Sequence, residues 1–560
     1  MFLEIIQIII FLSVLILFSP ILGYYIADTI QGKSNIKFLA RFENSIYKFC
    51  KIDPASEMDY KTYSFSLLTL NIAGILLLIM LQLIQYYLPF NPQKADNVEF
   101  TLAINTAISF VTNTNWQSYA GETTLSYFVQ MIGLTVQNFL SAATGIAVLL
   151  ALIRGITRKR GSTLGNFWVD MTRIIIYILL PLSIIFAVIL VSQGSVQTFQ
   201  PYKQVETLEG AKQIIPLGPA ASQIAIKQLG TNGGGFFNAN SAFPFENPTP
   251  FSNFLQTLAI LLIPSSLVFT YGKLIGSKKQ AWTIFGVMFF LFLCGLTISL
   301  LSEYSTNPVF GTGGLMEGKE ARFGVANSIL WSTATTAASN GSVNAMHSSL
   351  SPIAGLIALF NIQIGELIFG GAGSGLYGII LFIFLTVFIA GLMVGRTPEY
   401  IGKKIEAYEI KLTIIAIILP NLVILLFTAI GLIAKSGLAG LSTKGPHGFT
   451  EILYAFSSAA GNNGSAFAGL NANNPFYNIS LAIGMLIGRF GIIIPVLAIA
   501  GSLVKKNITP VSQGTLRTDT FLFALLLIAI IIIVGALTFF PALALGPLME
   551  HLLMNNGFMF

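Results

Sequence analysis

The sequence predicts an all-α polytopic membrane protein with ten transmembrane helices. Of its 560 residues, 54% are hydrophobic and only 9% are charged, with a mean hydropathy of +0.77. A soluble domain carries roughly 25% charged residues, so this composition suits lipid as the solvent and excludes a soluble fold. Ten apolar runs have the length of about 20 residues that a helix needs to cross the hydrocarbon core. They cover residues 4–26, 63–88, 124–153, 170–192, 251–275, 281–303, 375–395, 412–434, 480–504 and 518–540.

Charge alternates between successive connections, which supports the number of spans. The odd-numbered connections hold 21 of the 30 Lys and Arg residues, among them Arg154, Arg158, Lys159 and Arg160. Basic connections stay in the cytoplasm by the positive-inside rule, so both termini are expected outside. The start of the chain lacks the basic segment and the small-residue cleavage site of a signal peptide, and we expect it to remain as the first helix.

The four long outer connections, residues 89–123, 193–250, 304–374 and 435–479, are not ordinary polar loops. Each contains an apolar stretch of about ten residues, which is too short to span and is the length expected of a re-entrant segment. A small polar cluster follows each stretch: TNTNWQ at 112–117, TNGGG at 231–235, SNGS at 339–342 and NNGS at 462–465. Aligned on these clusters, the loops share an Asn at positions 115, 232, 340 and 463.

Four such copies indicate an internal repeat of span, re-entrant pore loop and span around one ion path, with one extra helix at each end. The predicted units are 1–62, an N-terminal extra helix and cytoplasmic loop; 63–153, repeat 1 with filter loop 112–118; 170–275, repeat 2 with filter loop 231–235; 281–396, repeat 3 with filter loop 339–344; 412–504, repeat 4 with filter loop 462–466; and 518–560, a C-terminal extra helix.

The composition of these loops is typical of a filter for a dehydrated cation. Such filters replace the hydration shell of the ion with backbone carbonyl oxygens from four converging loops. Glycine permits the unusual backbone angles that this requires, and Asn, Thr and Ser can bond the freed N–H groups. A short helix that points its C-terminus at the centre adds negative potential. One Asn-Gly is only a turn signal, but four copies in equivalent places favour the filter.

Five segments resemble one family: TNTNWQSYAGE at 112–122, TNGGGFFNANSAFPFENPTPF at 231–251, SNGSVNAMH at 339–347, NNGSAFAGL at 462–470 and GRTPEYIGKKIE at 395–406. Together they are similar to the potassium-binding A subunit of the bacterial Kdp potassium-transporting P-type ATPase. The resemblance runs essentially end to end and implies the fold of the potassium transporter superfamily.

The resemblance further implies a potassium ion as the ligand and a potassium filter made by residues of all four loops. These are Asn113, Thr114, Asn115, Gln117, Thr231, Asn232, Gly233, Ser339, Asn340, Gly341, Asn462, Asn463 and Gly464. It implies a multi-pass location in the bacterial cytoplasmic (inner) membrane. The implied partners are a P-type ATPase catalytic subunit, to which potassium is passed, and two small accessory subunits.

Motifs for ATP hydrolysis are missing from the sequence. It contains neither Asp-Lys-Thr-Gly nor G-x-x-x-x-G-K-[ST]. The longest basic connections have about 35 residues, which is too short for a catalytic domain. We therefore expect no ATP binding and no catalysis by this chain alone. An autonomous channel or ion-coupled potassium transporter of the same superfamily is the alternative, and the specific loop sequences favour the ATPase subunit.

Two arginines lie within or at the end of predicted spans. Arg489 lies about ten residues into the ninth span, where an ionisable residue is a functional candidate. It could act as a barrier to leakage near the ion path or serve helix packing. Arg396 ends the seventh span and either extends to the interface or forms part of an intramembrane gate.

The remaining reactive residues have simpler interpretations. Cys50 and Cys294 lie far apart with no Cys/His cluster, and we expect two buried small side chains. His347 and His447 lie in outer connections without metal-ligand spacing, where ordinary polar contacts are expected.

Overall fold

The computed structural model describes residues 2–33, 36–395, 397–510 and 516–558. Within these ranges, ten helical segments are long and apolar enough to cross a membrane, which confirms the predicted number. They are α1 (Phe2–Ile30), α3 (Tyr60–Leu83), η2 with α6 (Val129–Thr157), α7 to α8 (Phe167–Ser192), α10 (Pro250–Leu274), α11 (Lys278–Tyr304), α14 (Ser374–Val394), α15 (Ala407–Ile433), α18 (Pro475–Leu503) and α19 to α20 (Phe521–Asn555).

Polar residues fix where several of these helices begin. Asp59 accepts a hydrogen bond from the backbone N–H of Thr62 at the start of α3, and Asn474 does the same for Tyr477 in α18. Thr249 forms a capping box with Ser252 at the start of α10. Each cap satisfies a backbone N–H that the helix itself leaves free.

Burial separates central from peripheral spans. In the most apolar 18 residues of each span, 83% are buried in the third span, 17% in α1 and 28% in the last span. The first and last spans are therefore the least buried of the ten described spans.

Four shorter helices lie inside the bundle, one in each long connection. They are α4 (Phe100–Val111), α9 (Ala220–Leu229), α12 (Gly324–Ala337) and α17 (Gly445–Gly461). All residues of α9 except Ser222 are buried, although the helix includes Lys227. The third connection also contains α13 (Pro352–Gln363), a second short apolar helix that the sequence analysis did not predict.

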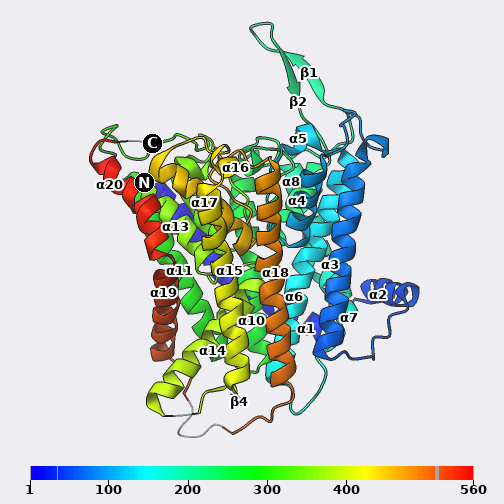
Figure 1. Ribbon diagram of the computed structural model, residues 1–560. Coiled ribbons are helices and arrows are strands. Elements are labelled where there is room, and N and C mark those ends of the chain that lie inside the picture. Colours follow the sequence, from blue (N-terminus) through cyan, green and yellow to red (C-terminus); the bar gives the residue numbers. More distant parts are fainter. Residues whose placement is uncertain (1, 34–35, 396, 511–515, 559–560) are drawn as a thin grey trace.

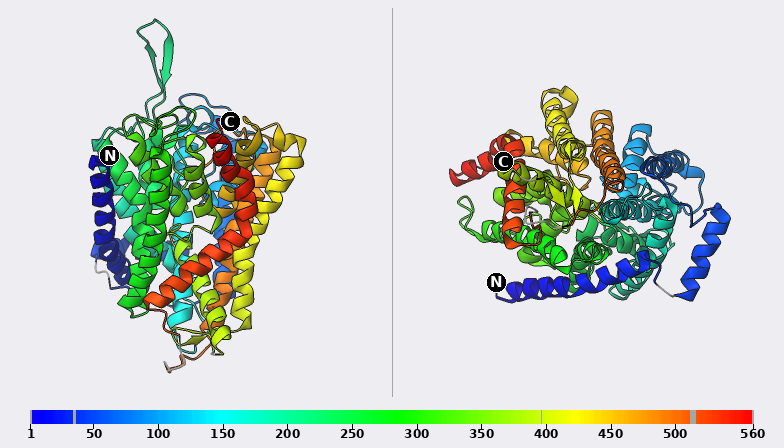
Figure 2. Two further views of the ribbon diagram at one scale, coloured as in Figure 1. Left: turned by 90° about the vertical axis from the view of Figure 1, so that its left-hand side faces the viewer. Right: turned by 90° about the horizontal axis from the view of Figure 1, so that it is seen from below.

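Both termini lie at one end of the bundle (Figures 1 and 2). At the same end β1 (Lys203–Glu206) and β2 (Lys212–Ile215) form an antiparallel hairpin that projects beyond the helices. The opposite end carries the short hairpin of β3 (Glu399–Tyr400) and β4 (Lys403–Lys404). Ten spans bring the two termini to one face, in agreement with the predicted topology.

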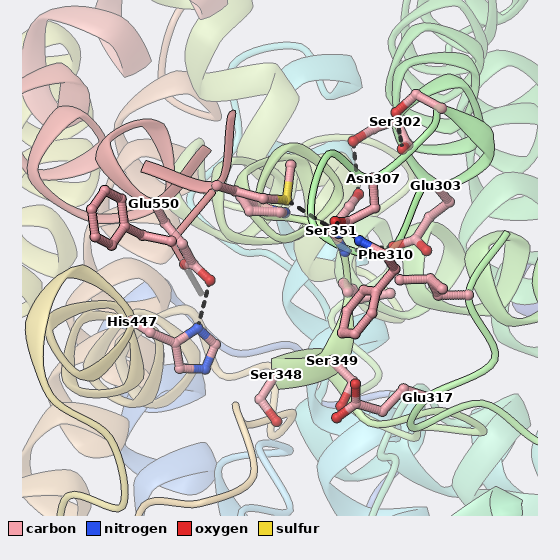
Figure 3. Close-up of a pocket in the computed structure, with 16 residues that line it drawn as sticks. Ser302, Glu303, Asn307, Phe310, Glu317, Ser348, Ser349, Ser351, His447 and Glu550 are labelled. Atoms are coloured by element: carbon pink, nitrogen blue, oxygen red, sulfur yellow. Dashed lines mark hydrogen bonds and ion pairs between the residues drawn. The ribbon is translucent and has the colours of Figure 1, made fainter. Parts of the chain in front are cut away.

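A pocket of about 130 Å³ lies beside the C-terminal helix α20 (Met549–Asn555) and is shown in Figure 3. His447, in the first turn of α17, approaches Glu550 of α20 to 2.9 Å. Burial disfavours the charged imidazole, but the Glu550 carboxylate outweighs this and raises the pKa of His447. This contact fastens the end of the chain to the short helix α17.

Cys50 departs from expectation, because it is exposed at the end of helix α2 (Lys37–Cys50). Cys294 is partly buried in α11.

An ion pair between the largely buried Arg154 and the buried Asp170 joins three helices at the end of the bundle opposite the termini. The Arg154 guanidinium, at the end of α6, donates two hydrogen bonds of 2.6 Å to the Asp170 carboxylate of α7. The Tyr63 hydroxyl of α3 donates to the same carboxylate at 2.9 Å.

We predict that Asp170→Asn destabilises the protein by about 3–5 kcal/mol, because it leaves the Arg154 charge buried without its partner. The matched control is Asp28→Asn, which breaks a half-exposed pair with Lys273 and should cost about 0–1 kcal/mol. Thermal unfolding of the purified variants in detergent measures both. Equal shifts in the two variants would show that the Arg154–Asp170 pair is not structurally important.

Candidate ion-binding site

The polar cluster after each short helix has the same backbone conformation in all four loops. Two residues with positive φ flank one middle residue: Asn113 and Asn115, Thr231 and Gly233, Ser339 and Gly341, Asn462 and Gly464. The N–H of each middle residue donates to the carbonyl five residues earlier, at 2.8–3.1 Å. The middle residues are Thr114, Asn232, Asn340 and Asn463.

This pattern corrects the predicted alignment of the first loop. The residue equivalent to Asn232, Asn340 and Asn463 is Thr114, whereas the sequence alignment used Asn115. Asn115 instead occupies the position of the glycines in the other loops. In the first cluster two Asn residues flank Thr114, and matching Asn with Asn selected Asn115 instead of Thr114.

Glycine in three loops allows close contact with the next loop. A Cβ atom on Gly233 would overlap the carbonyl oxygen of Asn340. A Cβ on Gly341 would overlap the Asn463 carbonyl, and one on Gly464 would overlap that of Thr114. The second loop therefore contacts the third, the third contacts the fourth, and the fourth contacts the first.

The first loop completes the ring in a different way, since Asn115 has a side chain. Its Nδ2 donates to Asn138 Oδ1 at 2.8 Å, and the space beside it is provided by Gly234 of the second loop. The four loops thus form a closed ring, and the C-terminal ends of α4, α9, α12 and α17 converge on it.

Side chains also tie neighbouring loops together. Asn113 Nδ2 donates to the Thr231 carbonyl at 2.8 Å, and Asn462 Nδ2 donates to Thr114 Oγ1 at 2.9 Å. Ser339 Oγ donates to the Asn462 carbonyl at 2.9 Å. These amides and hydroxyls serve the contacts between loops, and two of them bond the Thr231 and Asn462 carbonyls. The candidate ion ligands are therefore the backbone carbonyls that accept no such bond.

The carbonyls of the four middle residues, Thr114, Asn232, Asn340 and Asn463, are the clearest candidates. All four residues are 0% exposed, yet within the described part of the chain no N–H or O–H donates to their carbonyl oxygens. Nearly all buried backbone carbonyls in proteins have a hydrogen-bond partner. Four equivalent carbonyls without a donor, in one ring of contacting loops, could together coordinate a dehydrated cation.

Gln117, also predicted for the filter, lies beside the ring and faces the second loop. Its side-chain amide exchanges two hydrogen bonds with the backbone of Gly235, at 2.9 and 3.0 Å. It therefore acts between loops 1 and 2.

Lys227 and Glu246, which the sequence analysis did not single out, form a fully buried ion pair behind the second loop. The Lys227 ammonium also donates to Asn240 Oδ1 at 2.8 Å, and Asn240 Nδ2 donates to the Gly233 carbonyl at 2.8 Å. A buried charge pair is thus linked to Gly233 of the second loop through the amide of Asn240. The only sequence signal was that Asn240 and Glu246 lie in the long motif after the second loop.

Behind the third and fourth loops lie two further buried groups. Asn463 Nδ2 donates to Glu366 Oε1 at 2.7 Å. His347 Nδ1 lies 3.0 Å from the Tyr454 hydroxyl, which lies 2.8 Å from Ser465 Oγ. Burial lowers the pKa of His347 to about 4, so its imidazole is neutral near pH 7.

Arg489 is 5% exposed and donates to the Ser141 carbonyl of α6 at 2.9 Å. Ser141 Oγ in turn donates to Asn113 Oδ1 at 2.8 Å, so Arg489 is linked to the first loop through one residue. Arg396, the other predicted gate residue, lies outside the described residues.

The family model of the potassium-transporting ATPase A subunit matches residues 9–552. Three relatives are named as the potassium-binding subunit of the potassium-transporting ATPase. The one from Leptospira interrogans is 56% identical over 100% of both chains. The one from Herpetosiphon aurantiacus is 55% identical over 99% of both, and the one from Pseudomonas aeruginosa is 52% identical over 98% of this chain and 99% of the relative.

Among solved structures, the potassium transporter TrkH from Vibrio parahaemolyticus is similar, with a TM-score of 0.52. The identity is 16%, and the alignment covers 88% of this chain and 97% of TrkH. A likeness at this identity shows the fold alone, and it confirms the predicted fold class. The family match over nearly the whole chain also confirms the resemblance found in the sequence: this chain belongs to the potassium-transporting ATPase A subunit family.

Proposed function

We propose that this chain is the potassium-binding, channel-like subunit of an ATP-driven high-affinity potassium uptake complex. The observation that carries the proposal is the ring of four buried carbonyls, at Thr114, Asn232, Asn340 and Asn463, which have no donor within the described protein. The names of the relatives, which are potassium-binding subunits, support potassium as the ion.

The proposed ion path starts at the face that carries the termini and the long connections, which we place outside a bacterial cytoplasmic (inner) membrane. The ion loses water as it enters the ring, and carbonyl oxygens of loops 113–115, 231–233, 339–341 and 462–464 replace that water, above all those of the four middle residues. The C-terminal ends of the four short helices add negative potential at the same point. Negative potential and oxygen ligands together favour a cation.

Beyond the ring, we propose that potassium passes to a P-type ATPase catalytic subunit, which binds the ATP, with two small accessory subunits completing the complex. The Arg489 guanidinium, buried near the first loop, would disfavour a second cation beside it and so slow leakage. In the alternative, an autonomous channel or transporter, the chain alone would conduct potassium.

The alternative is tested by purifying the chain with and without its co-expressed partners. We predict potassium-stimulated ATP hydrolysis only in the sample that contains the ATPase subunit, and no sustained potassium flux in vesicles that hold this chain alone. Sustained flux from the isolated chain, with no ATPase subunit co-purifying, would replace the pump subunit with an autonomous transporter.

The ring predicts a specific effect of Gly341→Ala. The residue has a φ of +82°, and a Cβ would collide with the Asn463 carbonyl. The potassium half-saturation constant of the ATPase should therefore rise at least about tenfold, which corresponds to a loss of about 1.4 kcal/mol in binding free energy. Gly210→Ala is the matched control, since Gly210 has a φ of +79° and open space around it. Equal effects, or none in either variant, would place ion selection elsewhere.

Variants of the buried Lys227–Glu246 pair should separate two effects: the effect of its charges on stability and the effect of Lys227 on the position of Asn240. Lys227→Met alone leaves the Glu246 charge buried, and we expect a loss of about 3–5 kcal/mol in stability. Lys227→Met with Glu246→Gln removes both charges and should restore folding. Potassium affinity should still fall several-fold, because Asn240 has lost the donor that orients its amide toward Gly233.

The control for this pair is Lys319→Met with Glu303→Gln, which removes another buried pair at an N–O distance of 3.1 Å. Its potassium half-saturation constant should stay at the wild-type value. If the Lys227→Met/Glu246→Gln protein folds and keeps the wild-type potassium affinity, Lys227 only neutralises Glu246 and does not position Asn240 for ion binding.

A further inference from the structure

Helix α2 (Lys37–Cys50) lies against the bundle from outside, on the half opposite the termini, and extends sideways from it (Figures 1 and 2). The predicted unit 1–62 contained only a cytoplasmic loop here. The helix carries three different faces, and their arrangement indicates what surrounds it.

The first face attaches the helix to the bundle through one buried carboxylate. Glu43 accepts from Arg173 Nε at 2.8 Å, from the Tyr177 hydroxyl at 2.7 Å and from the Tyr47 hydroxyl at 2.7 Å. Arg173 lies six residues beyond Phe167, where the fourth span begins. At 1.5 Å per residue this is about 9 Å along the helix, so α2 lies near one end of that span.

The second face is apolar and uncovered. Phe38, Phe42 and Phe49 are 77%, 51% and 89% exposed. Their spacing of four and then seven residues places them on one stripe of a helix. An apolar groove of about 490 Å³ adjoins this stripe between α2 and the fourth span. It is lined among others by Ile36, Leu39, Ile176 and Ile184.

The third face is basic and has the same spacing. Lys37, Arg41 and Lys48 each precede one of the three Phe residues by one position, and all three are exposed. The basic stripe is therefore turned by about 100° from the aromatic stripe. Aromatic and basic stripes side by side on a helix that runs along a membrane surface are typical of an interfacial anchor.

We propose that α2 lies in the bilayer interface on the side of the basic connections and binds an anionic phospholipid there. The three Phe rings enter the boundary between headgroups and acyl chains, and one acyl chain occupies the groove beside Ile176 and Ile184. The phosphates of this lipid and its anionic neighbours pair with Lys37, Arg41 and Lys48, because basic side chains next to a membrane attract anionic headgroups. A partner protein on the same face is the competing occupant.

Photo-crosslinking in the intact complex in native membranes identifies the occupant of the aromatic face. A benzoylphenylalanine at position 42 should form adducts of phospholipid mass, whereas the same group at position 44 should form few or none. A crosslink from position 42 to another polypeptide, or equal lipid adducts at both positions, would overturn the proposal.

The basic stripe is tested by the lipid that stays bound. The purified complex is exchanged into vesicles of phosphatidylcholine with phosphatidylglycerol, and retained phosphatidylglycerol is measured by mass spectrometry. Lys37→Gln/Arg41→Gln/Lys48→Gln should lower the retained amount about tenfold or more. The control Lys94→Gln/Lys203→Gln/Lys212→Gln removes three lysines from the opposite end and should change it little. Equal retention in both variants would contradict a phosphate site on α2.

Discussion

A buried backbone carbonyl normally accepts a hydrogen bond, and the loops of this structure converge where four equivalent carbonyls accept none from the described residues. In lipid, only helices and closed β-barrels pair all of their own backbone groups, so other backbone occurs at membrane depth only where protein buries it or it lines a water-filled cavity. The four short helices end inside the bundle, and the loops that follow them are buried. Their middle carbonyls, at Thr114, Asn232, Asn340 and Asn463, have no donor in the described protein. In the proposed function, a cation coordinated by these oxygens takes the place of the missing donors.

Fourfold geometry is obtained from loops that are not identical. Three loops use glycine where the next loop approaches, and the first uses Asn115 opposite Gly234. Behind the loops the supports also differ: Asn138 stands behind the first, the Lys227–Glu246 pair and Asn240 behind the second, and Glu366 contacts the fourth. The backbone conformation of the loop is therefore similar in all four copies, while the side chains that hold it differ from loop to loop.

The sequence was sufficient for the parts governed by simple periodicity and charge. The length of the apolar runs and the alternation of basic connections predicted the ten spans, and repeated polar clusters predicted the four loops. The one-residue error at Asn115 arose because backbone conformation, not residue identity, defines equivalence. Lys227, Glu246 and Glu366 were not predicted, since only the fold brings them together. Helix α2 was missed because it has only 14 residues and no apolar run long enough to span a membrane.

The most direct test of the ring is the position of the ion itself. A structure of the complex, prepared with thallium or rubidium in place of potassium and analysed by anomalous scattering, locates the bound ion. Our account predicts a strong peak inside the ring of loops, within ligand distance of the four middle carbonyls. A peak elsewhere with an empty ring, or the same ring occupancy in an excess of sodium, would contradict it.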